Sequence, residues 1–165
     1  MKLVRLKQHQ PIYSPAFYTS AQLGYKTCLR CSVHDGYLGI FVHFMPGEDD
    51  DLIQWPFKGQ FHLRLKNRQR SDEDLVEKMS TQPKMTAFNC PSPEGLRNGC
   101  NPVGFGFQEL ISINDLMNRG FWNSSRDEVV VIARILVAHG DDTHVEAVAD
   151  ADAGAGRRLL TPERC

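Results

Sequence analysis

Short segments in which apolar and polar residues alternate account for most of the chain. Residues 25–33, 38–45 and 61–66 each place their larger apolar side chains at every second position. A period of two predicts β-strands that turn one face toward a core. Residues 128–137 instead form a nearly continuous β-branched run, which predicts a central strand buried on both faces.

The polar faces of these strands are not alike. In 61–66 the outer side chains are His62, Arg64 and Lys66, as expected of a solvated surface. In 25–33 and 38–45 the outer faces instead bring Arg30 and Phe41 onto neighbouring strands. An exposed aromatic side chain near an exposed arginine favours a recognition patch. The alternative is that both are ordinary surface residues.

Turns and one helix complete the pattern. Links rich in turn residues cover 46–51, 67–74 and 91–102. Ser112 and Asp115 have the spacing of a capping box, so we expect one short helix there, ended by Gly120. Many short strands with a single helix predict an all-β fold, an antiparallel β-sandwich.

The composition changes after residue 137, which divides the chain into two parts. Residues 1–137 contain the predicted strands and form the expected domain. Residues 138–165 are rich in Ala, Gly and Asp and have no hydrophobic period. Such a segment buries too little apolar surface to offset the entropy of ordering, so we predict a disordered tail.

Charge and cysteine usage limit the classes of partner and compartment. The 165 residues carry a formal net charge of −1, which gives no electrostatic case for nucleic acid or an anionic membrane. No window is long and apolar enough for a membrane span, and the N-terminus lacks the features of a signal peptide. The five cysteines are irregularly spaced, as expected of reduced thiols in a cytoplasmic protein.

Motifs for metal, cofactor or catalytic chemistry are missing from the pattern. Cys28 and Cys31 lie three residues apart on a predicted strand, so their side chains point to opposite faces and cannot share a metal ion. A phosphate-binding loop, a dinucleotide fingerprint and a nucleophile elbow do not occur. We therefore expect no metal, no cofactor and no enzyme activity; a cysteine–histidine pair formed only in space remains the alternative.

Glycine and phenylalanine alternate in residues 104–107. Glycine weakens the interior of a strand, so two of them need a reason. Either the backbone of Gly104 and Gly106 is left bare for close approach by another chain, or the glycines mark a bulge.

Several motifs in order resemble a known family. They are Ser14-Pro-Ala-Phe-Tyr18, Gly24-Tyr-Lys-Thr-Cys-Leu-Arg30, Gly47-Glu-Asp-Asp50, Trp55-Pro-Phe57, Asn101-Pro-Val-Gly-Phe-Gly-Phe107, Asp115-Leu116 and Arg126-Asp-Glu-Val129. Together they resemble the C-terminal MATH domain of the TNF-receptor-associated factors, the TRAF adaptors, over roughly Ile12 to Leu136. The Gly-Phe-Gly-aromatic strand is most similar to the sixth TRAF, which serves Toll and interleukin-1 receptors.

The resemblance implies a non-catalytic signalling adaptor module for TNF-receptor and Toll-type pathways. It would bind extended receptor or kinase peptides of the form Pro-x-Glu-x-x-aromatic/acidic by adding them as a strand at a sheet edge. Other TRAF-C domains are a further implied partner. The implied peptide-binding residues are Arg30 facing the last peptide residue, Phe41, Phe105 and Phe107 lining apolar pockets, the backbone of Thr86 and Ala87 capping the glutamate, and Val103, Gly104 and Gly106 along the peptide.

The chain also departs from this family. Val103 stands where the sixth TRAF has a lysine, and the loop from Asn89 to Cys100 is longer. No counterpart of the family's first strand, RING, zinc fingers or coiled coil is recognised, so we expect an N-terminally truncated sandwich that neither transfers ubiquitin nor trimerises. A substrate-recruiting MATH module of the ubiquitin system, and a fragment without function, remain alternatives.

Overall fold

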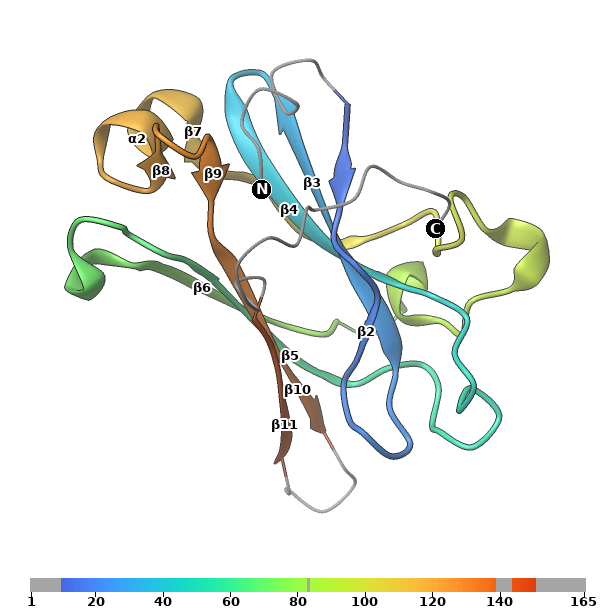
Figure 1. Cartoon of the computed structure of the whole chain (residues 1–165). Coiled ribbons are helices and arrows are strands. Elements are labelled where there is room, and N and C mark those ends of the chain that lie inside the picture. The colour runs from blue at the N-terminus through green and yellow to red at the C-terminus, as the bar shows by residue number, and fades with distance from the viewer. Residues whose placement is uncertain (1–9, 83, 139–143, 151–165) are drawn as a thin grey trace.

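The chain folds into two main β-sheets that enclose one core (Figure 1). The computed structural model describes residues 10–82, 84–138 and 144–150. The first sheet has the order β1-β3-β4-β7, with β2 beside β3, and the second has the order β11-β10-β5-β6. All pairings between these strands are antiparallel. The predicted antiparallel β-sandwich is confirmed.

The strand bounds follow the alternating segments of the sequence. The first sheet contains β1 (Ile12–Tyr13), β2 (Phe17–Tyr18), β3 (Lys26–His34), β4 (Tyr37–Phe44) and β7 (Phe105–Ser112). The second contains β5 (Gly59–Leu65), β6 (Leu75–Ser80), β10 (Val131–Ala138) and β11 (His144–Asp150). A short ribbon pairs β8 (Trp122–Asn123) with β9 (Glu128–Val129).

Aromatic and aliphatic side chains from both sheets fill the space between them. The predicted inward faces are confirmed, because Ile40 and Phe44 of β4 and Phe61 and Leu63 of β5 are all at most 1% exposed. The rings of Phe44 and Phe57 lie 5.0 Å apart between their centroids. Full burial of each such side chain stabilises the fold by about 1.5–3 kcal/mol.

The strand β10 is central in its sheet but is not buried on both faces. Val131, Ala133, Ile135 and Val137 are buried, whereas the residues between them are only half-buried until Ala138, which is exposed. The prediction of a doubly buried strand is therefore wrong. The β-branched run therefore reflects strand preference on the outer face of this sheet and not complete burial.

The structure also differs from the sequence expectation at residue 138. Ala138 is the last residue of β10, and β11 pairs with β10 from Ala138↔His144 to Ile132↔Asp150. Main-chain hydrogen bonding to an existing strand gives a segment partners that its composition does not reveal. Residues 139–143 and 151–165 of the predicted tail lie outside the described residues.

The expected short helix is present as α2 (Ile113–Asn118). Its first turn is capped by Ser112, whose Oγ accepts a hydrogen bond from the backbone N–H of Asp115 at 3.0 Å. Gly120 follows with φ of 87°, the conformation that ends helices. Within the described residues, no helix has the length and apolarity required to cross a membrane.

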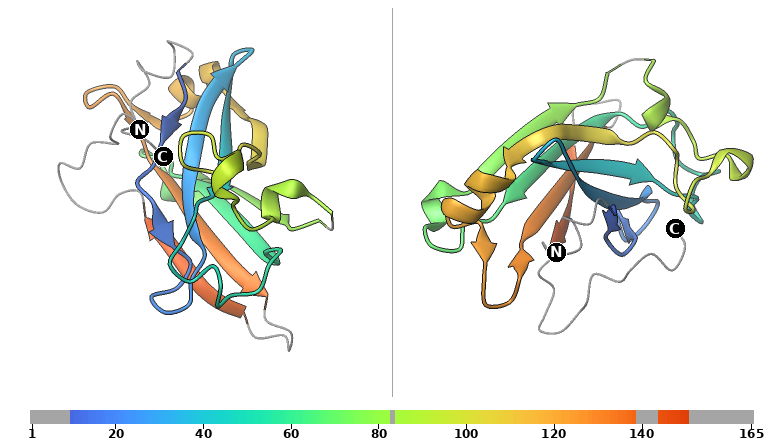
Figure 2. Two further views of the ribbon diagram at one scale, coloured as in Figure 1. Left: turned by 90° about the vertical axis from the view of Figure 1, so that its right-hand side faces the viewer. Right: turned by 90° about the horizontal axis from the view of Figure 1, so that it is seen from above.

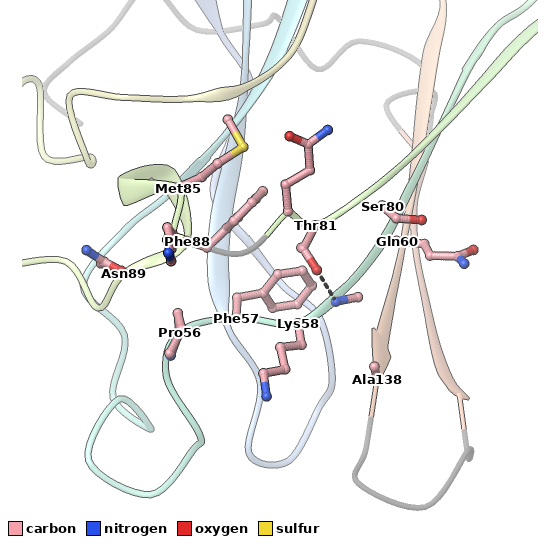
Figure 3. Close-up of a pocket in the computed structure, with 13 residues that line it drawn as sticks. Pro56, Phe57, Lys58, Gln60, Ser80, Thr81, Met85, Phe88, Asn89 and Ala138 are labelled. Carbon is pink, nitrogen blue, oxygen red and sulfur yellow. Dashed lines mark hydrogen bonds between the residues drawn. The ribbon is translucent and has the colours of Figure 1, made fainter.

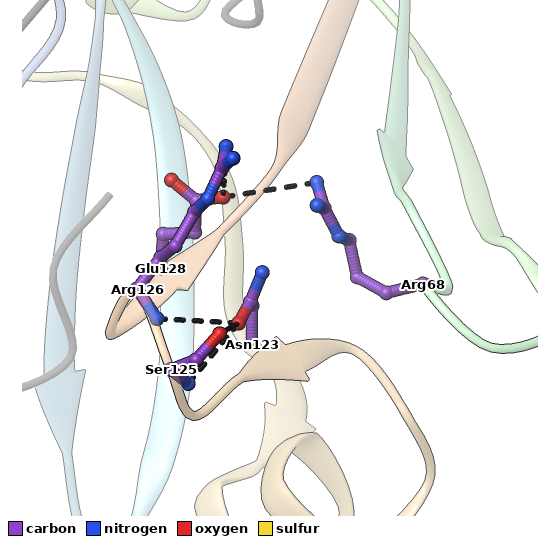
Figure 4. A network of polar contacts seen from close by, with 5 residues as sticks. All are labelled: Arg68, Asn123, Ser125, Arg126 and Glu128. Carbon is purple, nitrogen blue, oxygen red and sulfur yellow. Dashed lines mark hydrogen bonds and ion pairs between the residues drawn. The ribbon is translucent and has the colours of Figure 1, made fainter. Parts of the chain in front are cut away.

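Beside α2, the β8–β9 ribbon is held by surface polar contacts (Figure 4). The carboxylate of Glu128 lies 3.8 Å from the guanidinium of Arg68 and 4.0 Å from that of Arg126. The side-chain oxygen of Asn123 accepts hydrogen bonds from Ser125 and from the backbone N–H of Arg126. Exposed pairs of this kind contribute little stability, about 0–1 kcal/mol each.

A long connection, residues 89–104, lies over the outer face of the first sheet. It follows the 3₁₀ turn η2 (Thr86–Phe88) and contains η3 (Pro93–Gly95); a third turn, η1 (Ser71–Glu73), lies elsewhere. In the left view of Figure 2 this yellow-green segment lies in front of the blue strands. Its residue Cys100 packs with Tyr13, Cys28 and Met45 in a second small core on that outer face.

Candidate functional site

A row of four residues crosses the whole of the first sheet. Tyr13 of β1 is opposite Arg30 of β3, Arg30 is opposite Phe41 of β4, and Phe41 is opposite Gly106 of β7. Residues directly opposite each other project on the same face of a sheet. Here that face is the outer one, because the alternate positions Leu29 and Ile40 belong to the core.

A hollow of about 510 Å³ opens over this row. Its lining residues are Pro11, Tyr13, Arg30, Phe41, His43, Arg97, Asn98, Asn101, Pro102, Val103 and Gly104. The lining includes two arginines and no aspartate or glutamate. The hollow is therefore a cationic site on a chain whose overall net charge is −1.

Arg30 is half-buried and packs on its neighbour in the row. Its guanidinium carbon lies 5.9 Å from the centre of the Phe41 ring, within the range of a cation–π contact. The predicted pairing of Arg30 with Phe41 on the outer face is thus present. The aromatic ring orients the arginine and leaves the edge of its guanidinium for hydrogen bonds.

The far wall of the hollow is a tight turn at Arg97–Cys100. Arg97 N–H donates to the carbonyl of Cys100 at 2.9 Å, and Cys100 N–H donates to the carbonyl of Arg97 at 3.1 Å. Between them Asn98 and Gly99 have φ of 52° and 74°, as in the two-residue hairpin turns that favour Asn-Gly.

Several contacts attach this turn to the sheet below it. The sulfur atoms of Cys28 and Cys100 lie 3.5 Å apart, a contact and not a covalent bond. The Asn98 side-chain N–H₂ lies 3.4 Å from the hydroxyl of Tyr13. Asn101 N–H donates to the carbonyl of Phe44 at 2.8 Å. The position of Arg97 is therefore fixed by the sheet.

His43 forms the floor of the hollow and is 6% exposed. Its Nδ1 lies 2.9 Å from the carbonyl oxygen of Asn101 and donates to it, while Nε2 is buried without a hydrogen-bond partner among the described residues. Burial lowers the pKa of His43; the hydrogen bond to Asn101 opposes this in part, and the charge of Arg30 adds a smaller lowering effect. The ring is therefore neutral at pH 7.

The two glycines serve the sheet itself. A Cβ atom on Gly106 would lie 2.0 Å from the carbonyl oxygen of Ile40, and one on Gly104 would lie 2.3 Å from Nε2 of His43. Both directions point at β4 and not at open solvent. The close approach of β4 therefore requires the glycines, and our interpretation of a backbone left bare for a peptide stays a prediction.

Phe105 and Phe107 project on the opposite face from the hollow. They pair with Val42 and Ile40, which belong to the core, and are themselves half-buried against it. The Phe105 ring lies 4.8 Å from that of Phe88. Neither phenylalanine lines the cationic hollow.

The turn η2 places Thr86 and Ala87 at the start of β7, beside the Phe88–Phe105 contact. Thr86 is exposed, and Ala87 is buried. In the described structure, the backbone hydrogen bonds of this turn begin at Phe88 N–H, so those bonds do not use the amides of Thr86 and Ala87.

The strand β7 ends its sheet. In the described sheet order β4 lies on one side of β7 and no strand lies on the other. The pairing register shifts between Leu38 and Ile40, so residues 108–110 of β7 oppose the single residue Gly39. A bulge is thus present, just beyond the glycines, and the regular part of the open edge is short.

A second hollow, of about 650 Å³, lies at the end of the other sheet (Figure 3). Phe57, Met85 and Phe88 form its apolar part, and the hydroxyl of Thr81 accepts from Gly59 N–H at 3.1 Å beside it. None of the residues predicted as a site lines it. In the part of the chain that the structure describes, no group of three or more His, Cys, Asp or Glu is placed to hold a metal ion.

Of the predicted site residues, the structure brings Arg30, Phe41, Val103 and Gly104 together in the cationic hollow. The other five lie on the opposite face, at η2 or within the sheet row. Sequence reasoning did not include Tyr13, His43 and Arg97. The dipeptide Asn98-Gly99 is the signal that could have predicted the turn that positions Arg97.

Comparison with known families identifies the chain's relatives. The sequence model of the family described as "TRAF/meprin, MATH domain" matches residues 9–132. TNF receptor-associated factor 6-A of Xenopus laevis is 35% identical over 119 residues, covering 67% of this chain and 20% of that protein. TNF receptor-associated factor 6 of Danio rerio is 36% identical over 121 residues, covering 68% and 21%.

A human relative and a solved structure agree with these matches. TNF receptor-associated factor 6 of Homo sapiens is 32% identical over 119 residues, covering 67% of this chain and 22% of that protein. The chain thus spans about a fifth of the length of these curated relatives. A solved TRAF5 structure from Notothenia coriiceps matches with a TM-score of 0.67 at 18% identity, covering 96% of this chain and 70% of that one, which shows a shared fold.

Proposed function

The chain belongs to the TRAF/meprin MATH-domain family, and on this premise we propose that it is a non-catalytic adaptor module that binds an extended peptide along β7. The peptide has the form Pro-x-Glu-x-x-aromatic/acidic and comes from the cytoplasmic part of a receptor or kinase. The module then acts in TNF-receptor and Toll-type signalling.

The observation that carries the proposal is the open edge of β7 next to the cationic hollow. An added strand would use the unpaired main-chain groups of Phe105–Phe107, in the binding mode known as β-augmentation. From that edge, the row Gly106–Phe41–Arg30 leads across the outer face into the hollow.

Side chains of a bound strand would alternate between two surfaces. Those on the outer face lie toward Gly106, Phe41 and Arg30, and those on the inner face lie toward Phe105 and Phe107. An extended peptide at the edge would contact both faces. This arrangement supports a role for Arg30, Phe41 and Gly106 on the outer face and for Phe105 and Phe107 on the inner face.

The glutamate of the peptide would be bound at η2. The amides of Thr86 and Ala87 precede the turn's own hydrogen bonds and are the proposed donors to its carboxylate. Val103, which is 47% exposed, offers only apolar contact at the edge of the hollow. The interface with one short peptide is expected to bury less than about 1,200 Å², which places it in the class of weak and transient complexes.

Isothermal titration calorimetry with a synthetic Pro-Gln-Glu-Asn-Ala-Tyr peptide tests the proposal. We expect a Kd in the micromolar range or weaker, about tenfold weaker still in Arg30→Ala and in Phe41→Ala, because about 1–2 kcal/mol of contact is lost. Arg64→Ala on β5, at an exposed position away from the hollow, is the matched control and should bind like the parent.

Hydrogen exchange at the backbone amides locates the binding surface on the chain. Bound peptide should slow hydrogen exchange at the amides of β7 and leave those of β6 unchanged. Absence of binding, or Arg30→Ala and Phe41→Ala variants that bind as well as the parent, would overturn the proposal. A Ser/Thr-rich peptide of the type read by ubiquitin-recruiting MATH modules serves as the competing ligand; tighter binding of that peptide would favour the alternative function.

A further inference from the structure

Two arginines face the hollow without a negative partner. Arg30 and Arg97 both line it, and neither takes part in an ion pair within the described residues. By contrast, Arg64, Arg68 and Arg70 on the other sheet and its loop each lie within 4.0 Å of a carboxylate. The hollow thus keeps two positive charges available, although the chain as a whole is slightly acidic.

The packing of Arg30 decides which ligand chemistry suits it. The guanidinium carbon of Arg30 lies over the Phe41 ring, 5.9 Å from its centre, so one side of the group is already occupied. The donors that remain lie in the plane, at the edge of the group, and match the two oxygens of a carboxylate. An aromatic peptide side chain would gain only its contact with the guanidinium of Arg30, whereas a carboxylate can pair with both arginines that line the hollow.

Arg97 adds to this preference from the opposite wall. The backbone of its turn is closed by reciprocal hydrogen bonds with Cys100, and Asn98 contacts the hydroxyl of Tyr13. A charge carried on a fixed backbone is available to a ligand at a lower entropic cost than one on a loose loop. Pro102 and Val103 border the site with apolar surface, which reduces the screening of charges by water.

We propose that the hollow selects an acidic over an aromatic residue at the peptide position facing Arg30, and that Arg97 determines this choice. The inference rests on the proposed function, because it assigns the chemistry of the ligand at the same groove. Arg97 acts as a specificity residue: it strengthens binding of peptides with a carboxylate at that position and contributes little to the others.

Fluorescence anisotropy with three labelled peptides tests the inference. The peptides are Pro-Gln-Glu-Asn-Ala-Glu and its variants ending in Gln and in Tyr, and each is titrated with the parent chain, Arg97→Gln and Arg70→Gln. Arg70→Gln removes the same charge at η1, away from the hollow. The parent should bind the Glu peptide about three- to fivefold more tightly than the Gln and Tyr peptides, the range of a partly exposed ion pair.

The expected pattern is specific to one variant and one peptide. Arg97→Gln should remove the preference for Glu while leaving the affinity for the Gln peptide within about 1.5-fold, and Arg70→Gln should retain the preference. Raising the salt from about 0.05 to about 0.5 M should reduce the preference in the parent, because the Debye length falls several-fold.

Two failures can be distinguished. If all three peptides bind but the parent does not prefer Glu, the acidic specificity is wrong and the adaptor function stands. If Arg97→Gln and Arg70→Gln behave alike, the assignment of this specificity to Arg97 is wrong, and the adaptor function again stands. If none of the peptides binds the parent chain, the proposed function itself is wrong and the inference falls with it.

Discussion

The edge strands β6 and β7 differ in what they offer to another chain. Each ends its sheet in the described structure. The edge of β6 carries the charges Glu77 and Lys78 in its middle, and Glu77 lies opposite Leu63 of the neighbouring strand. A charge placed toward the core side of an edge strand discourages the addition of a further strand. β6 is therefore a protected edge.

The first part of β7 has no such protection. Phe105–Phe107 carry no charge, and Gln108 and Glu109 appear only where the bulge begins. A bulge twists the strand and ends regular pairing. Under the proposed function, the edge would accept an added strand over this short length, and the bulge would end the pairing beyond it. The two halves of β7 would then differ in the same way as β7 and β6 do.

The largest effect should come from Gly106→Ala, which alters the close packing of β7 on β4. The new Cβ would lie 2.0 Å from Ile40 O and 2.6 Å from Phe41 Cα. Both are backbone atoms, so no side-chain rotation relieves the clash. We expect more than about 2 kcal/mol of lost unfolding free energy, measured by urea denaturation, together with loss of peptide binding.

Gly95→Ala in η3 is the matched control for that substitution. A Cβ on Gly95 meets nothing within 4 Å, so its unfolding free energy should stay within about 0.5 kcal/mol of the parent. If Gly106→Ala were as stable as Gly95→Ala, the glycines would not be required by the approach of β4.

The second prediction gives β7 the kind of charge that β6 already has. Phe107→Lys replaces a side chain that is half-buried against the core with an ammonium group at the open edge. We expect peptide affinity to fall by about tenfold or more, because the added strand would lose an apolar contact and would have to desolvate the charge. Val76→Lys on β6, where the side chain is 42% exposed, should leave affinity unchanged. The two affinities are measured by calorimetry at a temperature where melting curves show that both variants are folded. An equal loss of peptide affinity in the two variants would show that the peptide does not use β7.

Local patterns predicted the strands of this fold because each has one buried face. Alternation in residues 25–33 and 38–45 gave β3 and β4 almost at their observed bounds. The cap of α2 was also predictable from a local pattern, because Ser112 and Asp115 are only three positions apart. Each of these features depends on neighbours in the sequence.

Other features depend on contacts that a local pattern does not contain. The clash that a Cβ on Gly106 would meet comes from the backbone of Ile40, which lies far away in the chain. Arg97 reaches the hollow because Cys100 packs on Cys28, 72 residues earlier. The strand β11 has no hydrophobic period, and it is defined by main-chain pairing with β10.

The smallest effect we expect is on the pH dependence of stability, which one histidine beside each edge should produce. His43 lies under the start of β7, and His62 is opposite Lys78 of β6. Burial lowers the pKa of both; Arg30 lowers that of His43 further, and Lys78 and Arg134 lower that of His62. As the pH falls, the histidines of the unfolded chain, with a pKa of about 6.5, therefore take up protons at a higher pH than those of the folded chain.

The free energy of unfolding should thus reach its full value above about pH 6.5 and should decrease as the pH is lowered below it. Urea midpoints measured between about pH 7.5 and about pH 5 give the slope. His43→Gln should reduce this slope more than His62→Gln, because His43 is 6% exposed and His62 is only partly buried. A proton on Nε2 of His43 would have no hydrogen-bond acceptor among the described residues. Equal slopes in the two variants would contradict the conclusion that the β7 side of the sandwich holds the more strongly buried histidine.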